Sequence, residues 1–359
     1  MGLQSLEIRD FRNIQQASLG FAPGLNLVTG KNAAGKTSLL EAIYCLGRVR
    51  SFRTHSAEQP IRYGQPAFRL VGRIIAGEGR SLPIGIERQT KGLRVHLNGE
   101  AITRLSDLAG CFPVQVLSAD TPTILHGGPR YRRQTLDWAL FHVEHNYREL
   151  WQRYTRILRQ RNAALRGHAT PALVKVWDGE LVEAAEQLDQ FRRGYLEALE
   201  PHLEDALHWL LPGPEMEWRY QPGWPTQTGF SEVLESALGK DREYGYTRYG
   251  PHRADFSLLL DGHGVATHCS RGQQKAVTVG FMLAQVKLQQ RLSAAMGAFL
   301  LDDLTSELDA GHQQRVFEVL RDLDTQVFVS AIEAESVSHP ALQEARRFHV
   351  EHGVIQEVV

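Results

Sequence analysis

The sequence predicts an α/β protein with an antiparallel β-subdomain and an inserted, mostly helical second domain. Three observations predict this fold class. A glycine-rich loop at residues 30–37 lies between an expected strand and an expected helix. Near the carboxyl end, apolar runs at 299–301 and 326–330 indicate a second set of buried strands. Between these regions lie two helical stretches, 130–166 and 171–211.

The amino-terminal part contains a strand–loop–helix unit followed by short strands. Residues 3–8 alternate in polarity as a strand does, and residues 25–29 form an apolar run before the loop. Residues 36–46 place leucine and isoleucine on one helical face. Between 68 and 103, apolar runs are punctuated by glycine, and Asn98-Gly99 is a strong hairpin signal. This pattern predicts the antiparallel subdomain.

The helical stretches contain no sustained heptad repeat, so we expect a compact helical domain and no long coiled coil. Strand character returns at 256–267, and helices are expected at 272–295 and 313–323. We therefore place the α/β head at residues 1–125 and 250–359, and the inserted helical domain at residues 126–249.

The composition excludes several classes of protein. Apolar residues make up 42% and charged residues 23% of the 359 residues, which is typical of globular proteins and not of disordered ones. No apolar run approaches the roughly 20 residues of a spanning helix, so we expect no membrane segment. The first residues predict no signal peptide. Three scattered cysteines without a CxxC pair favour a reduced cytoplasmic location.

Charge is segregated along the chain although the net charge is only −1. Residues 46–94 have a net charge of +7 and residues 129–166 a net charge of +6. Residues 167–245 have a net charge of −9 and residues 300–359 a net charge of −8. The two basic segments are candidates for contact with a polyanion.

The glycine-rich loop Gly30-Lys31-Asn32-Ala33-Ala34-Gly35-Lys36-Thr37 is a complete G-x-x-x-x-G-K-T phosphate-binding motif. Its two outer glycines let backbone N–H groups approach phosphates, and the following helix adds its N-terminal dipole. We expect Lys36 to reach the β- and γ-phosphates of ATP and Thr37 to be a ligand of Mg²⁺.

Such a loop requires an acidic residue at the end of a buried strand, and Phe299-Leu300-Leu301-Asp302-Asp303 provides one. We expect Asp302 to complete the Mg²⁺ shell and Asp303 to act as the general base toward the attacking water. With Lys36, Asp303 is therefore a candidate catalytic residue.

A third motif, Ser270-Arg271-Gly272-Gln273, directly precedes the long helix expected from residue 272. Ser270 is a natural N-cap, so a purely structural role competes with a functional one. Ser306-Glu307-Leu308-Asp309 follows the acid pair. The order of these motifs resembles that of ABC-type ATPases: a phosphate-binding loop, then S-x-G-Q, then a double acid, then S-x-L-D.

The ABC resemblance implies that two chains enclose two ATP molecules. In that family the S-x-G-Q serine contacts the γ-phosphate bound by the other protomer. Ser270, Gly272 and Gln273 would then contact nucleotide, and Ser270, Ser306 and Asp309 would lie at the dimer interface.

Three further segments resemble the RecF family of recombinational DNA-repair proteins, which is related to the SMC and Rad50 heads. They are Asp10-Phe11-Arg12-Asn13, the segment from Gly127 to Asp137, and Tyr249-Gly250-Pro251-His252-Arg253. The resemblance runs from residue 3 to the final strands, and the segment 301–309 is one of its most specific parts.

This resemblance implies an ATP-dependent homodimer that binds double-stranded and gapped DNA without a membrane partner. It also implies slow ATP hydrolysis and action with RecO and RecR, and indirectly with RecA, at single-strand gaps. Arg12 would lie near the nucleotide. Six arginines are candidate DNA contacts that a solvated helix face explains equally well: Arg48, Arg50, Arg53, Arg130, Arg132 and Arg133.

Other classes stay open at this point, namely an ATPase subunit of a transporter or of an SMC/Rad50-like nuclease complex. Two departures from ABC-type ATPases also appear. Asp303 stands where glutamate is usual, and Ser330-Ala331 stands where many of these enzymes carry a histidine. Gln115 is a weak candidate for a glutamine linked to Mg²⁺, and an ordinary strand glutamine is the more natural interpretation.

Overall fold

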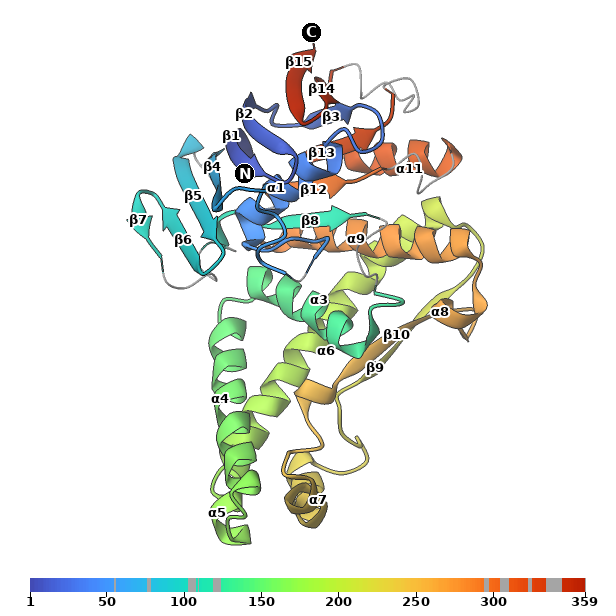
Figure 1. Cartoon of the computed structure of the whole chain (residues 1–359). Helices are drawn as coiled ribbons and strands as arrows, with labels where there is room; N and C mark the ends of the chain where they lie inside the picture. Colours follow the sequence, from blue (N-terminus) through green and yellow to red (C-terminus); the bar gives the residue numbers. More distant parts are fainter. Residues whose placement is uncertain are drawn as a thin grey trace. The chain divides into compact units, whose positions relative to one another are not determined.

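The computed structural model describes residues 1–54, 56–75, 79–102, 108, 110–118, 124–293, 297–303, 310–321, 325–333 and 344–358. The chain divides into two compact units, which Figure 1 shows in the colours of the sequence. The head unit comprises residues 1–121 and 279–359, and the helical unit comprises residues 122–278. In the described parts of the chain, no helix is both long and apolar enough to cross a membrane.

The head unit contains an antiparallel sheet in the order β2-β1-β4-β5-β6-β7. Its strands are β1 (Gly2–Phe11), β2 (Ile14–Gly20), β4 (Ala67–Ile75), β5 (Ser81–Gln89), β6 (Gly92–Leu97) and β7 (Glu100–Ala101). Asn98 and Gly99 turn between β6 and β7 with φ of 52° and 84°, the left-handed geometry of a type I′ hairpin turn. The predicted antiparallel subdomain is therefore present, with the β1–β2 hairpin added to its edge.

A second sheet of the head unit has the order β15-β14-β3-β13-β12-β8. Its strands are β3 (Leu25–Thr29), β8 (Val114–Leu117), β12 (Ala298–Leu301), β13 (Gln326–Ala331), β14 (Arg346–Glu351) and β15 (Val354–Val358). All neighbouring strands are parallel except β14 and β15, which are antiparallel. The strands expected at 25–29, 299–301 and 326–330 thus form the centre of one parallel sheet, whose buried apolar runs are typical of such strands.

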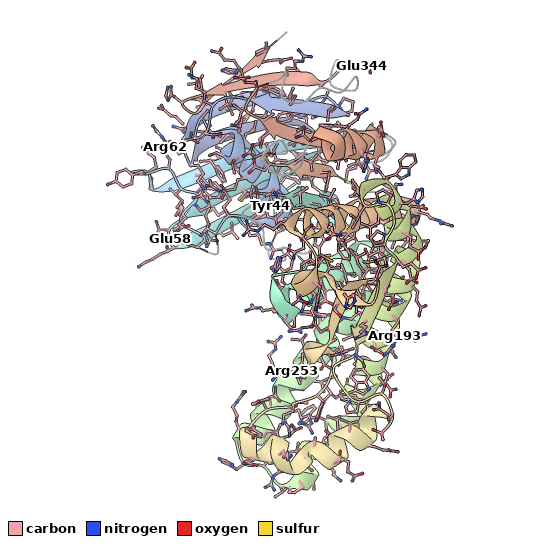
Figure 2. The ribbon with its side chains drawn as sticks, turned by 90° about the vertical axis from the view of Figure 1, so that its right-hand side faces the viewer. Tyr44, Glu58, Arg62, Arg193, Arg253 and Glu344 are labelled. Carbon is pink, nitrogen blue, oxygen red and sulfur yellow. The ribbon has the colours of Figure 1, made fainter. Side chains whose placement is uncertain are left out.

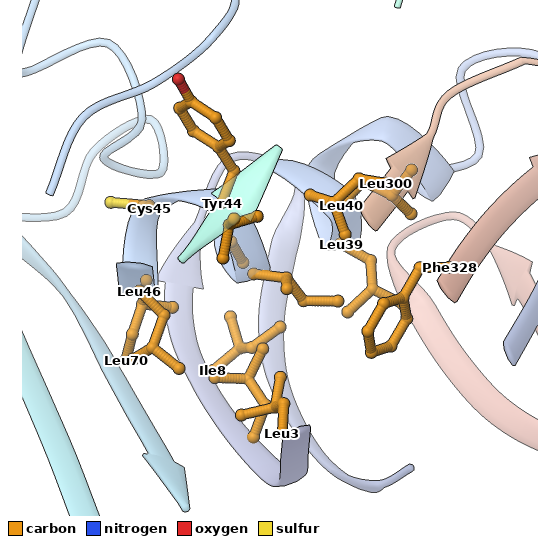
Figure 3. Packing of buried hydrophobic residues seen from close by; sticks show 14 of the residues in the cluster. Leu3, Ile8, Leu39, Leu40, Tyr44, Cys45, Leu46, Leu70, Leu300 and Phe328 are labelled. Carbon is orange, nitrogen blue, oxygen red and sulfur yellow. The ribbon is translucent and has the colours of Figure 1, made fainter. Parts of the chain in front are cut away.

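Helix α1 (Lys36–Arg48) shares one hydrophobic core with both sheets. Figure 3 shows Leu39, Leu40 and Leu46 of α1 among side chains of the two sheets, including Leu70 and Phe328. A Cβ on Gly72 of β4 would collide with the side chain of Leu46, so glycine allows this close approach. Each large apolar side chain that is fully buried contributes roughly 1.5–3 kcal/mol to the free energy of unfolding. This core therefore contributes strongly to the stability of the head unit.

Two further helices belong wholly or partly to the head unit. Helix α11 (Ala310–Arg321) lies between β12 and β13 in the chain. Helix α9 (Arg271–Ser293) begins in the helical unit and ends in the head unit. Both helices were expected from the sequence, with bounds that differ by a few residues.

The helical unit contains the predicted helices and a small sheet that was not predicted as part of it. Its helices are α3 (Gly128–Val143), α4 (Tyr147–Arg166), α5 (Pro171–Lys175), α6 (Asp178–Leu210), α7 (Phe230–Tyr244) and α8 (Val265–His268), with a 3-10 turn, η2 (Pro251–Arg253). A three-stranded antiparallel sheet has the order β11-β10-β9, from β9 (Met216–Gln221), β10 (Asp255–Leu260) and β11 (His263–Gly264).

The division between the units differs from the predicted return to the head at residue 250. Strand β10 pairs with β9 along its whole length, from Asp255 opposite Gln221 to Leu260 opposite Met216. This pairing holds residues 250–278 in the helical unit, and the chain returns to the head unit at residue 279. The first boundary, at 121–122, lies close to the predicted 125–126.

Buried arginines tie the helices of the helical unit together. Arg161 of α4 is fully buried and donates to Asp178 at 2.8 Å, to Asp241 at 2.8 Å and to the Thr247 hydroxyl at 2.8 Å. Arg192 of α6 is also buried and pairs with Asp137 of α3 at 2.8 Å. Because both cations are compensated by carboxylates, they fix which helices pack together.

Candidate nucleotide site

The glycine-rich loop begins and ends with residues in backbone conformations that favour glycine. Gly30 has φ of 147°, and a Cβ there would collide with the carbonyl oxygen of Val350. Gly35, the N-cap of α1, has φ of 123°, and its Cβ would lie 2.9 Å from Nδ2 of Asn13. The loop therefore has the compact backbone that a phosphate cradle requires.

Lys36 is buried at the start of α1, and its ammonium group bonds only backbone oxygens among the described contacts. Its Nζ donates to the carbonyl oxygens of Gly30 at 2.6 Å and Lys31 at 3.1 Å. Burial lowers the pKa of Lys36, while the nearby charges of Asp303 and Asp302 act in the opposite direction. A cation held by two carbonyls retains its full charge for a phosphate that displaces them.

Asp302 lies at the carboxyl end of β12 and gathers three hydroxyl groups. Its Oδ1 accepts from Thr37 Oγ1 at 3.1 Å and from Ser330 Oγ at 2.8 Å, and its Oδ2 accepts from Ser118 Oγ at 3.4 Å. Burial raises the pKa of Asp302, and the hydrogen bonds from Ser330 and Thr37 oppose that rise. A carboxylate beside the threonine hydroxyl of the loop is the oxygen donor set that fits Mg²⁺.

Asp303 follows with φ of 55°, in the left-handed region that few residues other than glycine adopt. Its backbone N–H donates to Ser330 Oγ at 2.8 Å. Its charge raises the pKa of both Lys36 and Asp302, although burial is the larger influence on each. Asp303 therefore lies within electrostatic reach of the loop lysine, and its backbone is fixed by β13.

Ser330 is a site residue whose importance the sequence pattern did not reveal. One hydroxyl donates to Asp302 and accepts from the N–H of Asp303, so it fixes both members of the acid pair. Gln115 does not share in these contacts. It lies on β8 opposite Phe299, and both atoms of its buried side-chain amide lack a hydrogen-bond partner among the described residues.

Arg12 contacts α1 by pairing with Glu41, a site residue of that helix that the sequence analysis missed. The Glu41 carboxylate is fully buried and accepts from Arg12 Nε at 2.9 Å and Nη2 at 2.6 Å. The next residue, Asn13, donates from Nδ2 to the carbonyl of Ala34 in the loop at 3.0 Å. The segment 10–13 thus lies against the phosphate-binding loop, with Arg12 oriented by its bidentate pair with Glu41.

The three arginines that follow α1 differ in their surroundings. Arg48 lies over the ring of Tyr44, with 5.5 Å between its guanidinium carbon and the ring centroid. Arg50 is exposed. Arg53 Nη1 lies 3.8 Å from Glu41 Oε2, and its charge lowers the pKa of Asp302 against the larger effect of burial. Arg53 is therefore the member of this group with an electrostatic connection to the nucleotide site.

Ser270 and Gln273 form a reciprocal capping box at the start of α9. Ser270 Oγ accepts from the N–H of Gln273 at 3.3 Å, and Gln273 Oε1 accepts from the N–H of Ser270 at 2.9 Å. A Cβ on Gly272 would find only Ser270 Oγ nearby, at 3.9 Å. The chain itself thus uses Ser270 as a cap and gives no packing reason for glycine at position 272.

Two of the predicted DNA contacts have structural partners within the helical unit. Arg132 forms a bidentate pair with Asp255 at 2.7 and 2.8 Å, and Arg133 donates to the carbonyl of Ala254 at 2.7 Å. Their guanidinium groups hold α3 against β10 and the residue that precedes it. Arg130 of the same helix is exposed. The predicted interface residues Ser306 and Asp309 lie outside the described residues.

Comparison with family models matches residues 2–356 to the family described as RecF/RecN/SMC N terminal domain. Among curated proteins, the chain is 40% identical to the DNA replication and repair protein RecF of Edwardsiella ictaluri over 356 residues, which covers 99% of each chain. It is 39% identical to the protein of the same name from Klebsiella pneumoniae over 358 residues, 99% of this chain and 100% of that one.

Solved structures with the same fold include one described as the recombination mediator protein RecF-ATP in the RecFOR pathway. The two chains share 25% identity with a TM-score of 0.87, over 99% of this chain and 97% of the other. A more distant match is an SMC head bound to the C-winged helix domain of ScpA, with 14% identity and a TM-score of 0.60 over 100% and 97% of the chains. The fold is therefore that of an ABC-type ATPase head with an inserted helical unit.

Proposed function

This chain belongs to the RecF family, and we propose that it is an ATP-controlled DNA-binding clamp that acts in the repair of single-strand gaps. The observation that carries this proposal is the assembly of Lys36, Thr37 and Asp302. These side chains come from the phosphate-binding loop and from the end of a parallel strand, and they supply a cation and two oxygen ligands beside a backbone cradle.

ATP would bind with its β- and γ-phosphates at Lys36, which would exchange two backbone carbonyls for phosphate oxygens. The backbone N–H groups of the loop and the start of α1 add to this site. Thr37 and Asp302 are the residues that would hold Mg²⁺. When bound, this ion neutralises charge on the phosphates. Ser118 and Ser330 would keep the Asp302 carboxylate in position.

ATP binding is proposed to close a homodimer. Ser270 and Gln273 would lie against the γ-phosphate bound by the partner, and Ser306 and Asp309 would complete the interface. The small surface of Gly272, which the chain does not need for its own packing, supports a close approach by another molecule at the start of α9. The capping box preorganises Ser270 and Gln273 for this contact.

Asp303 is proposed to be the general base that receives a proton from the attacking water. Its carboxylate is one carbon shorter than the glutamate usual in ABC-type ATPases, which is consistent with slow hydrolysis. Hydrolysis would then act as a timer that opens the dimer and releases DNA.

Arginines at the end of α1, after it and on α3 would contact phosphates of double-stranded or gapped DNA. The candidates are Arg48, Arg50, Arg53, Arg130, Arg132 and Arg133, of which Arg132 and Arg133 also have partners within the helical unit. We further propose that the clamp works in the cytoplasm with RecO and RecR to help load RecA. The similarity to RecF over 99% of the chain favours this function over that of a transporter or nuclease ATPase subunit.

The experiment that tests this function measures DNA release by the Asp303→Asn variant. Loss of a general base costs roughly 10²–10⁴ in rate, so ATP turnover should fall by that factor while ATP binding persists. The variant should therefore release duplex DNA more slowly than the parent in the presence of ATP. Faster release together with lost turnover would contradict the proposal that hydrolysis opens the clamp.

A second pair of variants tests the dimer. Ser270→Arg should block ATP-dependent dimerisation in sedimentation while the monomer still binds ATP, because a large cation fills the space proposed for the partner's phosphate. Ser270→Thr is the matched control, since threonine also caps helices. A normal dimer with Ser270→Arg would leave Ser270 with its capping role alone.

A further inference from the structure

A groove in the helical unit lies beside the segment Tyr249–Arg253, which the proposed function leaves without a role. Its volume is about 610 Å³, within the range of ligand sites. The end of β9, the loop that follows it and the segment after α7 form its walls. Its aromatic and charged lining consists of Tyr220, Trp224, Tyr246, Arg248, Tyr249 and Arg253.

The backbone that carries these side chains is held rigidly. Gly250 has φ of 133°, and its N–H donates to the carbonyl of Gly223 at 3.0 Å. A Cβ on Gly223 would collide with the carbonyl of Gly250, so the two segments can approach only because residue 223 is glycine. A Cβ on Gly250 would instead lie 2.7 Å from the hydroxyl oxygen of Tyr154. The carbonyl of Pro251 accepts from the buried Arg192 at 2.7 Å. The groove is therefore preorganised.

His252 anchors the same segment from inside the unit. Its Nε2 lies 3.0 Å from the carbonyl of Thr247, and its Nδ1 lies 2.6 Å from the hydroxyl of Tyr154. Because a carbonyl can only accept, Nε2 carries the proton and Nδ1 accepts from Tyr154. The inward histidine is thus committed to structure, which leaves the outward Arg248 and Arg253 as the cations of the groove.

Arg248 and Arg253 differ from the arginines that hold the helical unit together. Arg248 lies over the rings of Tyr249 and Tyr244, at 5.4 and 5.6 Å, and Arg253 lies 5.4 Å from the ring centroid of Tyr246. Neither forms an ion pair with a carboxylate of the described residues. By contrast, Arg193 lies over Tyr220 but also pairs with Asp189 at 2.7 Å. Figure 2 labels Arg253 and Arg193 on the helical unit.

The lining of the groove contains no aspartate or glutamate, so the charges of Arg248 and Arg253 remain uncompensated there. Tyr246 is 39% exposed and offers a ring face beside Arg253. Aromatic rings that accept stacked bases, next to arginines that bind phosphates, are the chemistry of single-strand recognition. We propose that this groove binds unpaired nucleotides of a DNA strand, with bases stacked on the tyrosines and backbone phosphates on Arg248 and Arg253.

This inference rests on the proposed function, because it takes DNA as the ligand. It assigns to the helical unit the recognition of a gap as distinct from continuous duplex. A fully paired duplex keeps its bases stacked on one another and presents no free base face. Unpaired bases can leave the strand and stack on Tyr246 and its neighbours.

The test measures binding of labelled strands by fluorescence anisotropy, without nucleotide and at low salt. The probes are oligo(dT) of about twelve nucleotides, the same length of strand with abasic sites, and a blunt duplex. Tyr246→Ala and Arg253→Ala should each weaken oligo(dT) binding, the first by roughly five- to hundredfold. Arg193→Ala is the matched control and should leave binding unchanged, because Asp189 already compensates its charge.

The abasic strand separates base stacking from phosphate contact. Tyr246→Ala should not weaken binding of the abasic strand, whereas Arg253→Ala should weaken both strands. Equal losses with Tyr246→Ala on both strands, unchanged oligo(dT) binding in both variants, or absent binding by the parent would each overturn the inference. Urea unfolding confirms that the variants are folded.

The failure of this site can be distinguished from failure of the clamp. Lys36→Ala removes the nucleotide contact but leaves the groove intact, so it should bind oligo(dT) like the parent. If Lys36→Ala retained ATP-dependent duplex binding, the clamp would be refuted while the groove would stand. If Tyr246→Ala bound oligo(dT) normally, the groove would be refuted while the clamp would stand.

Discussion

Lys36 in the head unit and Arg161 in the helical unit are both buried cations, yet their partners differ in kind. Lys36 bonds two backbone carbonyls of its own loop. Arg161 has two carboxylates, Asp178 and Asp241, and the hydroxyl of Thr247. Carbonyl oxygens carry only partial charge, and burial lowers the pKa of Lys36 although the charges of Asp303 and Asp302 act in the opposite direction. Arg161 is compensated by the fold itself.

This difference distinguishes a cation that is available to bind an anionic ligand from one that stabilises the packing of helices. A buried charge without a carboxylate in hydrogen-bonding contact costs free energy until an anion arrives, whereas removing one partner of a buried ion pair is strongly destabilising. Among the described residues of the helical unit, Arg161 and Arg192 pair with carboxylates, whereas Arg248 and Arg253 lie over tyrosine rings. The partners of each cation thus indicate its role.

The largest expected effect is that of Lys36→Ala. ATP binding should be lost, because the side chain that would reach the β- and γ-phosphates is removed, and ATP-stimulated dimerisation and DNA binding should be lost with it. The free energy of unfolding should be unchanged or slightly higher, since a desolvated charge disappears. Equilibrium dialysis with ATP and urea unfolding check both parts. Normal ATP binding would show that Lys36 is not the phosphate contact.

Arg161→Ala should have the opposite pattern. It leaves Asp178 and Asp241 without their cation, and breaking a buried pair typically costs about 3–5 kcal/mol of unfolding free energy. All six tryptophans lie between residues 138 and 224, so intrinsic tryptophan fluorescence in urea reports on the helical unit. The exposed pair of Lys175 and Glu235 gives the control. Lys175→Ala should leave the urea unfolding midpoint unchanged. Equal effects of the two variants would contradict the view that the buried ion pair of Arg161 stabilises the helical unit more than the exposed pair does.

A smaller effect is expected from the protonation of His252. Burial lowers the pKa of His252 to about 4, below its ordinary value of 6.5. The unfolded chain therefore binds a proton as pH falls below about 6.5, whereas the native protein resists it until about pH 4. Between pH 7.5 and pH 5 this difference should remove about 2 kcal/mol of unfolding free energy, followed by tryptophan fluorescence.

The matched variant for this pH dependence is His252→Gln, which can contact Tyr154 and Thr247 but does not titrate. Its unfolding free energy should depend less on pH between 7.5 and 5 than that of the parent, whatever its absolute stability. The same pH dependence in both proteins would exclude His252 as its source.

The smallest expected effect is that of Ser330→Ala on ATP turnover. The Ser330 hydroxyl lowers the pKa of Asp302 against the larger effect of burial, so its removal should raise that pKa. Turnover at neutral pH should fall by roughly fivefold, the equivalent of about 1 kcal/mol for a hydrogen bond. The acidic limb of the pH–rate profile should move to higher pH. A uniform loss at every pH would instead indicate a general packing defect.

The candidate site could be predicted where its residues are close in sequence. The loop from Gly30 to Thr37 needs two glycines, a lysine and a hydroxyl in one turn, so the chemistry fits into eight consecutive residues. The cap formed by Ser270 and Gln273 is local for the same reason. The roles proposed for Asp303 and Ser270 remain predictions, because ATP hydrolysis and dimerisation require ATP and a second copy of the chain.

What the sequence by itself determined about this protein is therefore its local chemistry and the order of its elements. Apolar periodicity located most strands and helices, because buried faces repeat with the period of the backbone. Only the tertiary structure decided which distant side chains meet. Ser330 contacts Asp302, Glu41 orients Arg12, and β10 joins β9 so that the chain returns to the head unit at residue 279.

The physical reason is that these choices depend on the compensation of buried charge and on strand pairing between distant segments. The sequence shows how many arginines the chain has, but not which of them meet a carboxylate. Arg132 meets Asp255, whereas Arg253 meets the ring of Tyr246. That outcome is decided by the packing of the helical unit, and it separates the arginines that hold the fold from those available to a ligand.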